Sequence, residues 1–219
     1  MNDKDMPDIL VINANSSCSV TDNMKVELAG PTKIFKLKIE YTEISDAPAA
    51  IETTEDVILA HKLTTEFVKK VKARSYIIAC FCDPGVKELR ALGYKNVYGI
   101  AESAMHMAAN SGGKFGILSI SKTSVIRHKD QIRDVGLTEM LAADLPLDMG
   151  VLELEHMSAR PKIVETANKL IKDYDATSII LGCAGMGVHR KWLQDLLGIP
   201  VIDPCWAGVA MAAAAMGMA

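Results

Sequence analysis

Short apolar runs alternate with amphipathic helical patterns along the whole 219-residue chain. In one such helical pattern, Val57, Ala60, Leu63, Phe67 and Val71 recur every three or four positions. Most of the short runs are apolar throughout, which is typical of parallel strands that are covered on both faces. The alternation therefore predicts an α/β fold built on parallel sheets. The predicted strands are Ile9–Asn13, Ile34–Ile39, Tyr76–Cys80, Val97–Ile100, Phe115–Ile120, Met149–Leu154, Ser178–Cys183 and Val201–Asp203.

The chain also contains an internal repeat. The segment Arg74–Cys80 aligns with Thr177–Cys183, so that each copy ends in a cysteine. After each cysteine come a loop with glycine, a short helix, a short strand and a helix rich in Ala and Met. The repeat predicts two similar α/β halves of four strands each, related by a pseudo-twofold axis. We expect the first half over residues 1–104, the second over 105–203, and a C-terminal helix over 204–219 that packs back on the first half.

The composition disfavours several classes of function. A net charge of -3 gives no electrostatic basis for binding nucleic acid, and an aromatic share of 5% is too small for a base-stacking surface. The polar N-terminus does not resemble a signal peptide, and the apolar tail Cys205–Ala219 is shorter than the ~20 residues that cross a bilayer. An odd number of cysteines, five, predicts reduced thiols. We expect a cytoplasmic protein that acts on a small molecule, with no nucleic-acid or membrane partner.

The two repeated cysteines carry the predicted chemistry. Ligands of open parallel sheets bind outside the carboxyl ends of the strands, where Cys80 and Cys183 are expected. If the halves face one another, the two thiols meet across one cleft on opposite sides of a bound molecule. That geometry suits removal of a proton from one face of a carbon acid and its return to the other face, with a thiolate as base and a thiol as acid. We expect Asp83 and Pro84 to begin a helix that lowers the pKa of Cys80, and the glycine-rich loop after Cys183 to act likewise.

Other interpretations of these residues stay open. A strand-end cysteine is often only a part of the core. Cys80 and Cys82 could begin a metal site, but no second closely spaced pair completes it, so we expect no metal. The glycines of residues 182–187 follow a strand, as in nucleotide-binding oxidoreductases, but in reversed order. A non-catalytic two-lobed binding protein would use the same cleft. We expect His189, which follows the second cysteine loop, at a solvated helix position.

Five segments of the chain resemble the hydantoin racemases of the aspartate/glutamate racemase superfamily. Two of them surround the cysteines, with Ile-Ala-Cys-Phe-Cys-Asp-Pro-Gly over residues 78–85 and Ile-Leu-Gly-Cys-Ala-Gly-Met over residues 180–186. The others cover residues 12–17, 99–106 and 200–204, in the family's order. The resemblance implies cofactor-independent racemisation of a 5-substituted hydantoin or of allantoin, with the repeated cysteines as the catalytic pair.

The resemblance also implies a substrate-binding set, no cofactor and a homo-oligomer. The expected substrate-binding residues are Asn15, Ser16, Phe81, Cys82, Ser119, Ile120, Ala184 and Gly185. The chain departs from the family at Ala14, in place of a proline, at Cys82, in place of Asp or Gly, and at Ser119 and Ile120, in place of two threonines. These departures leave the ring substituent open. Racemisation of free aspartate or glutamate is the alternative, disfavoured because the signatures of the amino-acid racemases are absent at both cysteines.

Overall fold

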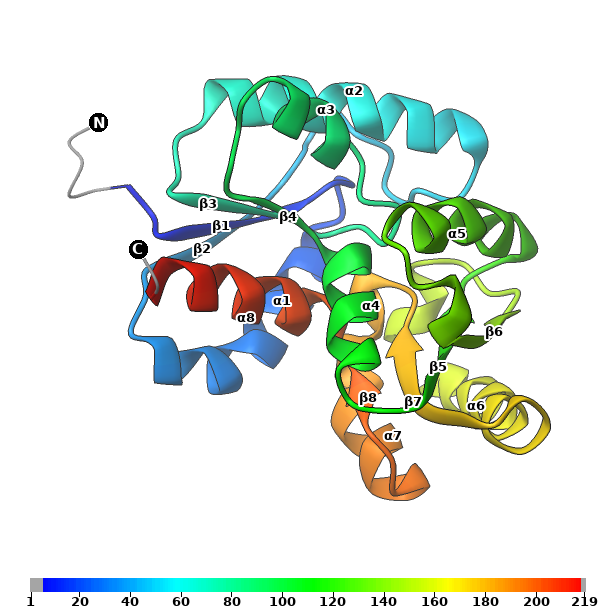
Figure 1. Ribbon diagram of the computed structural model, residues 1–219. Coiled ribbons are helices and arrows are strands. Elements are labelled where there is room, and N and C mark those ends of the chain that lie inside the picture. The colour runs from blue at the N-terminus through cyan, green and yellow to red at the C-terminus, as the bar shows by residue number, and fades with distance from the viewer. Residues whose placement is uncertain (1–5, 218–219) are drawn as a thin grey trace.

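The computed structural model describes residues 6–217, which form two parallel four-stranded sheets (Figure 1). The strands are β1 (Ile9–Asn13), β2 (Ile39–Glu43), β3 (Ser75–Ile78), β4 (Val97–Gly99), β5 (Lys114–Ser119), β6 (Leu141–Pro146), β7 (Ala176–Leu181) and β8 (Val201–Ile202). The strand order is β2-β1-β3-β4 in one sheet and β6-β5-β7-β8 in the other, which is the same topology twice. The predicted α/β fold with two similar halves is confirmed.

Helices connect the strands and cover both faces of each sheet. The α-helices are α1 (Cys18–Thr32), α2 (Thr54–Lys70), α3 (Val86–Ala91), α4 (Ile100–Ala109), α5 (Lys122–Asp134), α6 (Arg160–Tyr174), α7 (Arg190–Leu197) and α8 (Pro204–Gly217). Short 3-10 helices are η1 (Lys33–Phe35), η2 (Thr138–Met140), η3 (Glu153–Glu155), η4 (Met157–Ala159) and η5 (Ala184–His189). Side chains of Ser17, Thr53 and Ser121 cap the first turns of α1, α2 and α5. No helix within residues 6–217 has the length and apolar character needed to cross a membrane.

Alternate residues of β1 face two different cores. Leu10 and Ile12 belong to a cluster that includes side chains of α2 and α3, whereas Ile9 and Val11 pack in a cluster with α1 and α8. Because both faces are covered, the strand is apolar at every position. Helix α8 lies very close to the first sheet at Gly208, where a Cβ atom would stand only 3.0 Å from the Ile77 side chain.

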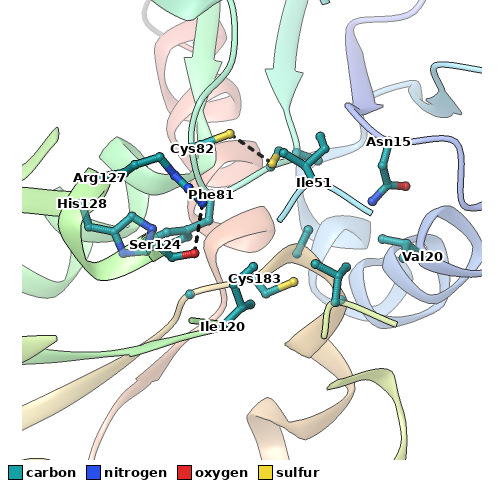
Figure 2. A pocket seen from close by; sticks show the side chains of 16 residues that line it. Asn15, Val20, Ile51, Phe81, Cys82, Ile120, Ser124, Arg127, His128 and Cys183 are labelled. Carbon is teal, nitrogen blue, oxygen red and sulfur yellow. Dashed lines mark hydrogen bonds between the residues drawn. The ribbon is translucent and has the colours of Figure 1, made fainter. Parts of the chain in front are cut away.

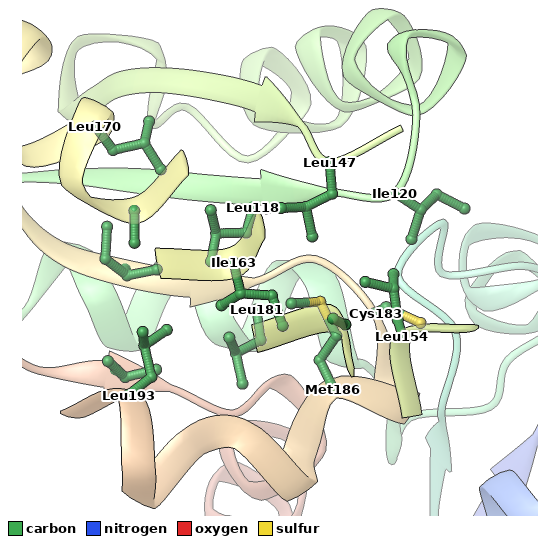
Figure 3. Packing of buried hydrophobic residues seen from close by; sticks show 14 of the residues in the cluster. Leu118, Ile120, Leu147, Leu154, Ile163, Leu170, Leu181, Cys183, Met186 and Leu193 are labelled. Carbon is green, nitrogen blue, oxygen red and sulfur yellow. The ribbon is translucent and has the colours of Figure 1, made fainter. Parts of the chain in front are cut away.

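Helix α4 links the two halves. It contacts α8 beside the first sheet, and its Met105 packs with Ile117 of β5 on one face of the second sheet. Helix α6 covers the opposite face of the second sheet through Ile163 and Leu170 (Figure 3). Cys183 belongs to this last cluster, so the core of the second half holds its position.

The structure corrects two of the predicted strands. The predicted strand Ile34–Ile39 begins too early, because η1 prolongs α1 and Lys36 then adopts a left-handed conformation (φ 54). The edge strand β2 starts only at Ile39. Met149–Leu154 is not a strand but a turn that leads into η3. The fourth strand of the second sheet is β6, which was missed because its alanines and Asp144 do not form an apolar run.

Candidate active site

The carboxyl ends of both sheets border one cavity, which is partly open to solvent (Figure 2). Residues that follow β1 and β3 line it from the first half, and residues that follow β5 and β7 line it from the second. This is where ligands bind in open parallel sheets. The expected site residues that line the cavity are Asn15, Cys80, Phe81, Cys82, Ile120, Cys183, Ala184 and Gly185. The other two, Ser16 and Ser119, do not line it.

Cys80 has a second thiol beside it. The Sγ atoms of Cys80 and Cys82 are 3.4 Å apart (Figure 2). The hydrogen bond from the Cys82 thiol lowers the pKa of Cys80 against the opposing effect of burial, and the Cys82 backbone amide and the Arg127 charge act in the same direction as that bond. The same contact raises the pKa of Cys82. Of this pair, Cys80 is therefore the thiol that loses its proton more readily.

Cys183 has the opposite character. Burial raises the pKa of its thiol to about 12, although the backbone amide of Gly185 acts in the other direction. This amide lies in the loop after Cys183, as the sequence suggested, but its effect is smaller than that of burial. Cys183 and Cys82 lie on opposite sides of the cavity in Figure 2, and the Cys82 thiol is hydrogen-bonded to the Cys80 thiol. The cavity thus has a thiol with a lowered pKa on one side and a thiol with a raised pKa on the other.

The predicted helix start behind Cys80 is wrong. Asp83 does not cap α3, which begins after Gly85 in a left-handed conformation (φ 78). The Asp83 carboxylate instead accepts hydrogen bonds from the backbone amides of Ala101 and Glu102 at the start of α4, both at 2.9 Å. Burial raises the pKa of this carboxyl to about 7. The neighbouring Cys82 thiol, and not a helix N-terminus, is the main group that lowers the pKa of Cys80.

Asn15 lies at one end of the cavity (Figure 2). Its Oδ1 accepts hydrogen bonds from Asn13 Nδ2 at 2.8 Å and from the Ser17 backbone amide at 2.9 Å. These bonds fix the side chain and leave its Nδ2 group as the donor for a ligand. Ser16 follows directly, but its backbone amide bonds to the carbonyl oxygen of Pro48.

Three residues of α5 line the other end of the cavity: Ser124, Arg127 and His128 (Figure 2). His128 Nδ1 lies 2.9 Å from Asp144 Oδ2 and 2.9 Å from Ser119 Oγ. Ser119 is fully buried in this network, which explains why its hydroxyl does not reach the cavity. Sequence reasoning missed the α5 residues, although their spacing of three and four places them on one helix face.

The prediction for His189 is also wrong. Its side chain is buried and not solvated, and its Nε2 donates a hydrogen bond to the Leu154 carbonyl oxygen at 2.8 Å. Burial lowers the pKa of this imidazole. Within residues 6–217, no group of three or more His, Cys, Asp or Glu side chains is arranged to hold a metal ion.

The family model for Asp/Glu/Hydantoin racemase matches residues 9–212. The chain belongs to this family. The hydantoin racemase of Paenarthrobacter aurescens is 35% identical over 211 residues, which are 93% of this chain and 89% of that protein. The hydantoin racemase of Rhizobium meliloti is 31% identical and covers 95% of this chain and 88% of its own. The protein is therefore a racemase, and the predicted resemblance to hydantoin racemases is confirmed.

Solved structures agree with the fold of this racemase. An allantoin racemase from Klebsiella pneumoniae superposes with a TM-score of 0.88 at 29% identity, over 96% of this chain and 87% of that chain. A glutamate racemase from Francisella tularensis, at 16% identity and a TM-score of 0.68, shares the fold over 97% of this chain and 81% of that chain.

Proposed function

We propose that the racemase inverts the C5 stereocentre of a 5-substituted hydantoin or of allantoin by proton transfer through two cysteines. The observation that supports this best is the opposite pKa shift of Cys80 and Cys183, which line one cavity. A base and an acid on opposite sides of a carbon acid are what inversion needs. The hydantoin and allantoin racemases among the similar proteins support this substrate class.

The reaction starts with the Cys80 thiolate, which removes the proton from C5 of the ring. The electron pair of the broken C–H bond moves onto the adjacent ring carbonyl and forms an enolate. The Cys183 thiol then gives its proton to the opposite face of C5, and the enolate electrons return to form the new C–H bond. The turnover leaves a thiol at Cys80 and a thiolate at Cys183, which is the state that the opposite enantiomer requires.

The variants Cys80→Ser and Cys183→Ser test this mechanism. A serine hydroxyl without an activating partner is too weakly acidic to act as a base at neutral pH. Each variant should therefore lose racemisation by a factor of at least ~10². Each also keeps one thiol, and should exchange the C5 proton of one enantiomer with solvent without inverting it. The enantiomer that exchanges should be opposite in the two variants.

The measurement uses each pure enantiomer of allantoin and of 5-isobutylhydantoin in D2O, with deuterium read by NMR and inversion by optical rotation. Cys18→Ser is the matched control, because Cys18 is exposed and outside the cavity. Racemisation that survives in either site variant, or exchange of the same enantiomer by both, would contradict the two-cysteine mechanism.

Two further expectations remain proposals of ours: that the racemase works in the cytoplasm, and that it is a homo-oligomer. Light scattering on the purified protein tests the second of these, with a monomer as the contrary outcome.

A further inference from the structure

Arg127 presents buried donors at the wall of the cavity. Its Nη2 donates a hydrogen bond to Ser124 Oγ at 3.1 Å. Its Nε and Nη1 are buried, and neither finds an acceptor among the side chains and backbone of residues 6–217. Within that range no carboxylate forms an ion pair with it either. A buried charged group with unused donors is costly unless a ligand supplies the acceptor.

A buried acceptor lies one helical turn further along α5. Gln131 Nε2 donates a hydrogen bond to the backbone carbonyl oxygen of Phe81 at 3.4 Å. The other polar atom of this side-chain amide, Oε1, is an acceptor. That Oε1 is buried and has no donor within the described chain. Arg127 and Gln131 both line a second cavity, which shares Arg127 and Cys82 with the first. The same part of the molecule thus offers unused donors and an unused acceptor.

The position of these groups in the site indicates which part of a substrate they would meet. Arg127 and Asn15 lie at opposite ends of the first cavity, with Cys82 and Cys183 between them on opposite sides (Figure 2). A stereocentre between the thiols directs the ring toward one end and the C5 substituent toward the other. The Nδ2 donor of Asn15 suits a carbonyl oxygen of the ring, which leaves the substituent for the Arg127 end.

We infer that Arg127 and Gln131 bind the C5 substituent and select one that ends in a ureido group. This inference rests on the proposed function and makes it more specific. A ureido group has a carbonyl oxygen that accepts hydrogen bonds from the guanidinium and N–H groups that donate to Gln131 Oε1. An alkyl substituent would leave both sets of polar atoms buried without partners, and sites of this kind discriminate strongly against such analogues. A carboxylate would accept hydrogen bonds from the guanidinium, but it has no N–H group to donate to Gln131 Oε1, so two acceptors would face one another.

The experiment compares three substrates: allantoin, which has the ureido group, 5-(carboxymethyl)hydantoin and 5-isobutylhydantoin. The wild-type racemase should have its highest kcat/KM with allantoin. In Arg127→Met, the ratio of kcat/KM for allantoin to that for 5-isobutylhydantoin should fall about 10- to 100-fold, mostly through KM for allantoin. Gln131→Leu should lower the same ratio. Lys129→Met is the matched control, since Lys129 is exposed on the same helix and should leave the ratio unchanged.

The ratio separates substrate recognition from the general effects of the substitution. Loss of folding, or loss of the Arg127 charge near Cys80, would lower the rates for all substrates together and leave the ratio unchanged, which would overturn the inference. An Arg127-dependent preference for 5-(carboxymethyl)hydantoin would overturn the ureido assignment, and a wild-type preference for 5-isobutylhydantoin would overturn the subsite. A wild-type protein that racemises none of the three would instead contradict the proposed function itself.

Discussion

At the scale of single residues, the site depends on what stands beside each thiol. Cys80 has the Cys82 thiol at 3.4 Å and the Arg127 charge nearby, and both favour its thiolate. Cys183 is surrounded by core side chains such as Met186 and Leu154, and its thiol stays protonated. The same residue type therefore has a lowered pKa on one side and a raised pKa on the other, because its surroundings differ, and this difference suits the base and acid roles that we propose.

Replacement of Cys82 should change the ionisation of Cys80. Without the thiol donor in Cys82→Ala, the pKa of Cys80 should rise, since a hydrogen bond to the charged form is lost. The pH at which Cys80 is half-maximally alkylated by iodoacetamide should move upward accordingly, with the peptide read by mass spectrometry. Turnover should be retained at pH values above the new pKa, because the proposed mechanism uses Cys80, and not Cys82, as the base.

Two comparison variants accompany this measurement. Cys82→Ser keeps a hydroxyl donor and should restore part of the shift, while Cys18→Ala changes an exposed thiol and should leave the Cys80 profile where it was. An unchanged profile in Cys82→Ala would mean that the 3.4 Å contact does not control the thiolate.

The two thiols could be found from the sequence, whereas Arg127 and His128 could not. Cys80 and Cys183 follow equivalent strands of an internal repeat, and such a repeat can be recognised by aligning the sequence with itself. Arg127 and His128 are polar residues in a helical pattern, which usually indicates a solvated face. His128 is buried where Asp144 and Ser119 approach it from two strands, and no local pattern predicts that approach.

At the scale of elements, the end of β7 sets the position of Cys183. The backbone amide of Gly182 donates to the Leu118 carbonyl oxygen at 2.9 Å, just beyond the last residue of the strand. A Cβ atom at Gly182 would lie 2.4 Å from that oxygen. Because the obstacle is backbone and not the end of a flexible side chain, β5 and β7 would have to move apart.

Gly182→Ala should therefore lower both stability and activity. We expect a loss of about 1–3 kcal/mol in the free energy of unfolding, as for overpacked cores, and a larger relative loss of racemisation since Cys183 moves with the strand. Urea unfolding and kcat measured on the same sample check this. Gly217→Ala is the control, because a Cβ at Gly217 meets nothing within 4 Å. Equal stability of the two variants would contradict the close approach.

Sequence patterns predict the buried strands of this protein well, but they predict the edge strand β6 and the helix caps less well. The buried strands β1, β3, β5 and β7 were predicted within a few residues, since continuous apolar runs specify them. The edge strand β6 was missed because it is half-buried and contains Asp144, whose carboxylate serves the His128 network. Asp83 looked like the cap of the next helix in sequence, yet it caps α4, which starts seventeen residues later and lies beside it only in the folded chain.

At the scale of the whole molecule, α4 and α8 join the halves. Helix α8 follows the last strand of the second sheet and packs on the first, where Val209 and Ala212 join the cluster of Ile9 and Val11 (Figure 1). The apolar tail of the sequence predicts a buried C-terminal helix over 204–219 that packs back on the first half. The sequence does not indicate which side chains of the first half this helix contacts, because they lie far from it along the chain.

A charge in the α8 contact should destabilise the protein. Ala212 is fully buried, and Ala214 on the same helix is exposed. Ala212→Asp should lower the free energy of unfolding by about 3 kcal/mol, because an unpaired polar group is buried in an apolar cluster. Ala214→Asp should change it by no more than about 0.5 kcal/mol. Thermal unfolding by circular dichroism measures both, and equal midpoints would refute this role of the helix contact.

The unlike neighbours of the two thiols have a thermodynamic consequence. For a substrate with one stereocentre in an achiral solvent, the two mirror images have equal free energy, so their equilibrium constant is one. The ratio kcat/KM must then be identical in both directions, however different the environments of Cys80 and Cys183 are. The difference between the thiols can appear only in kcat and KM separately, and both must change by the same factor. Whichever enantiomer has the lower KM is thus also the one with the lower kcat.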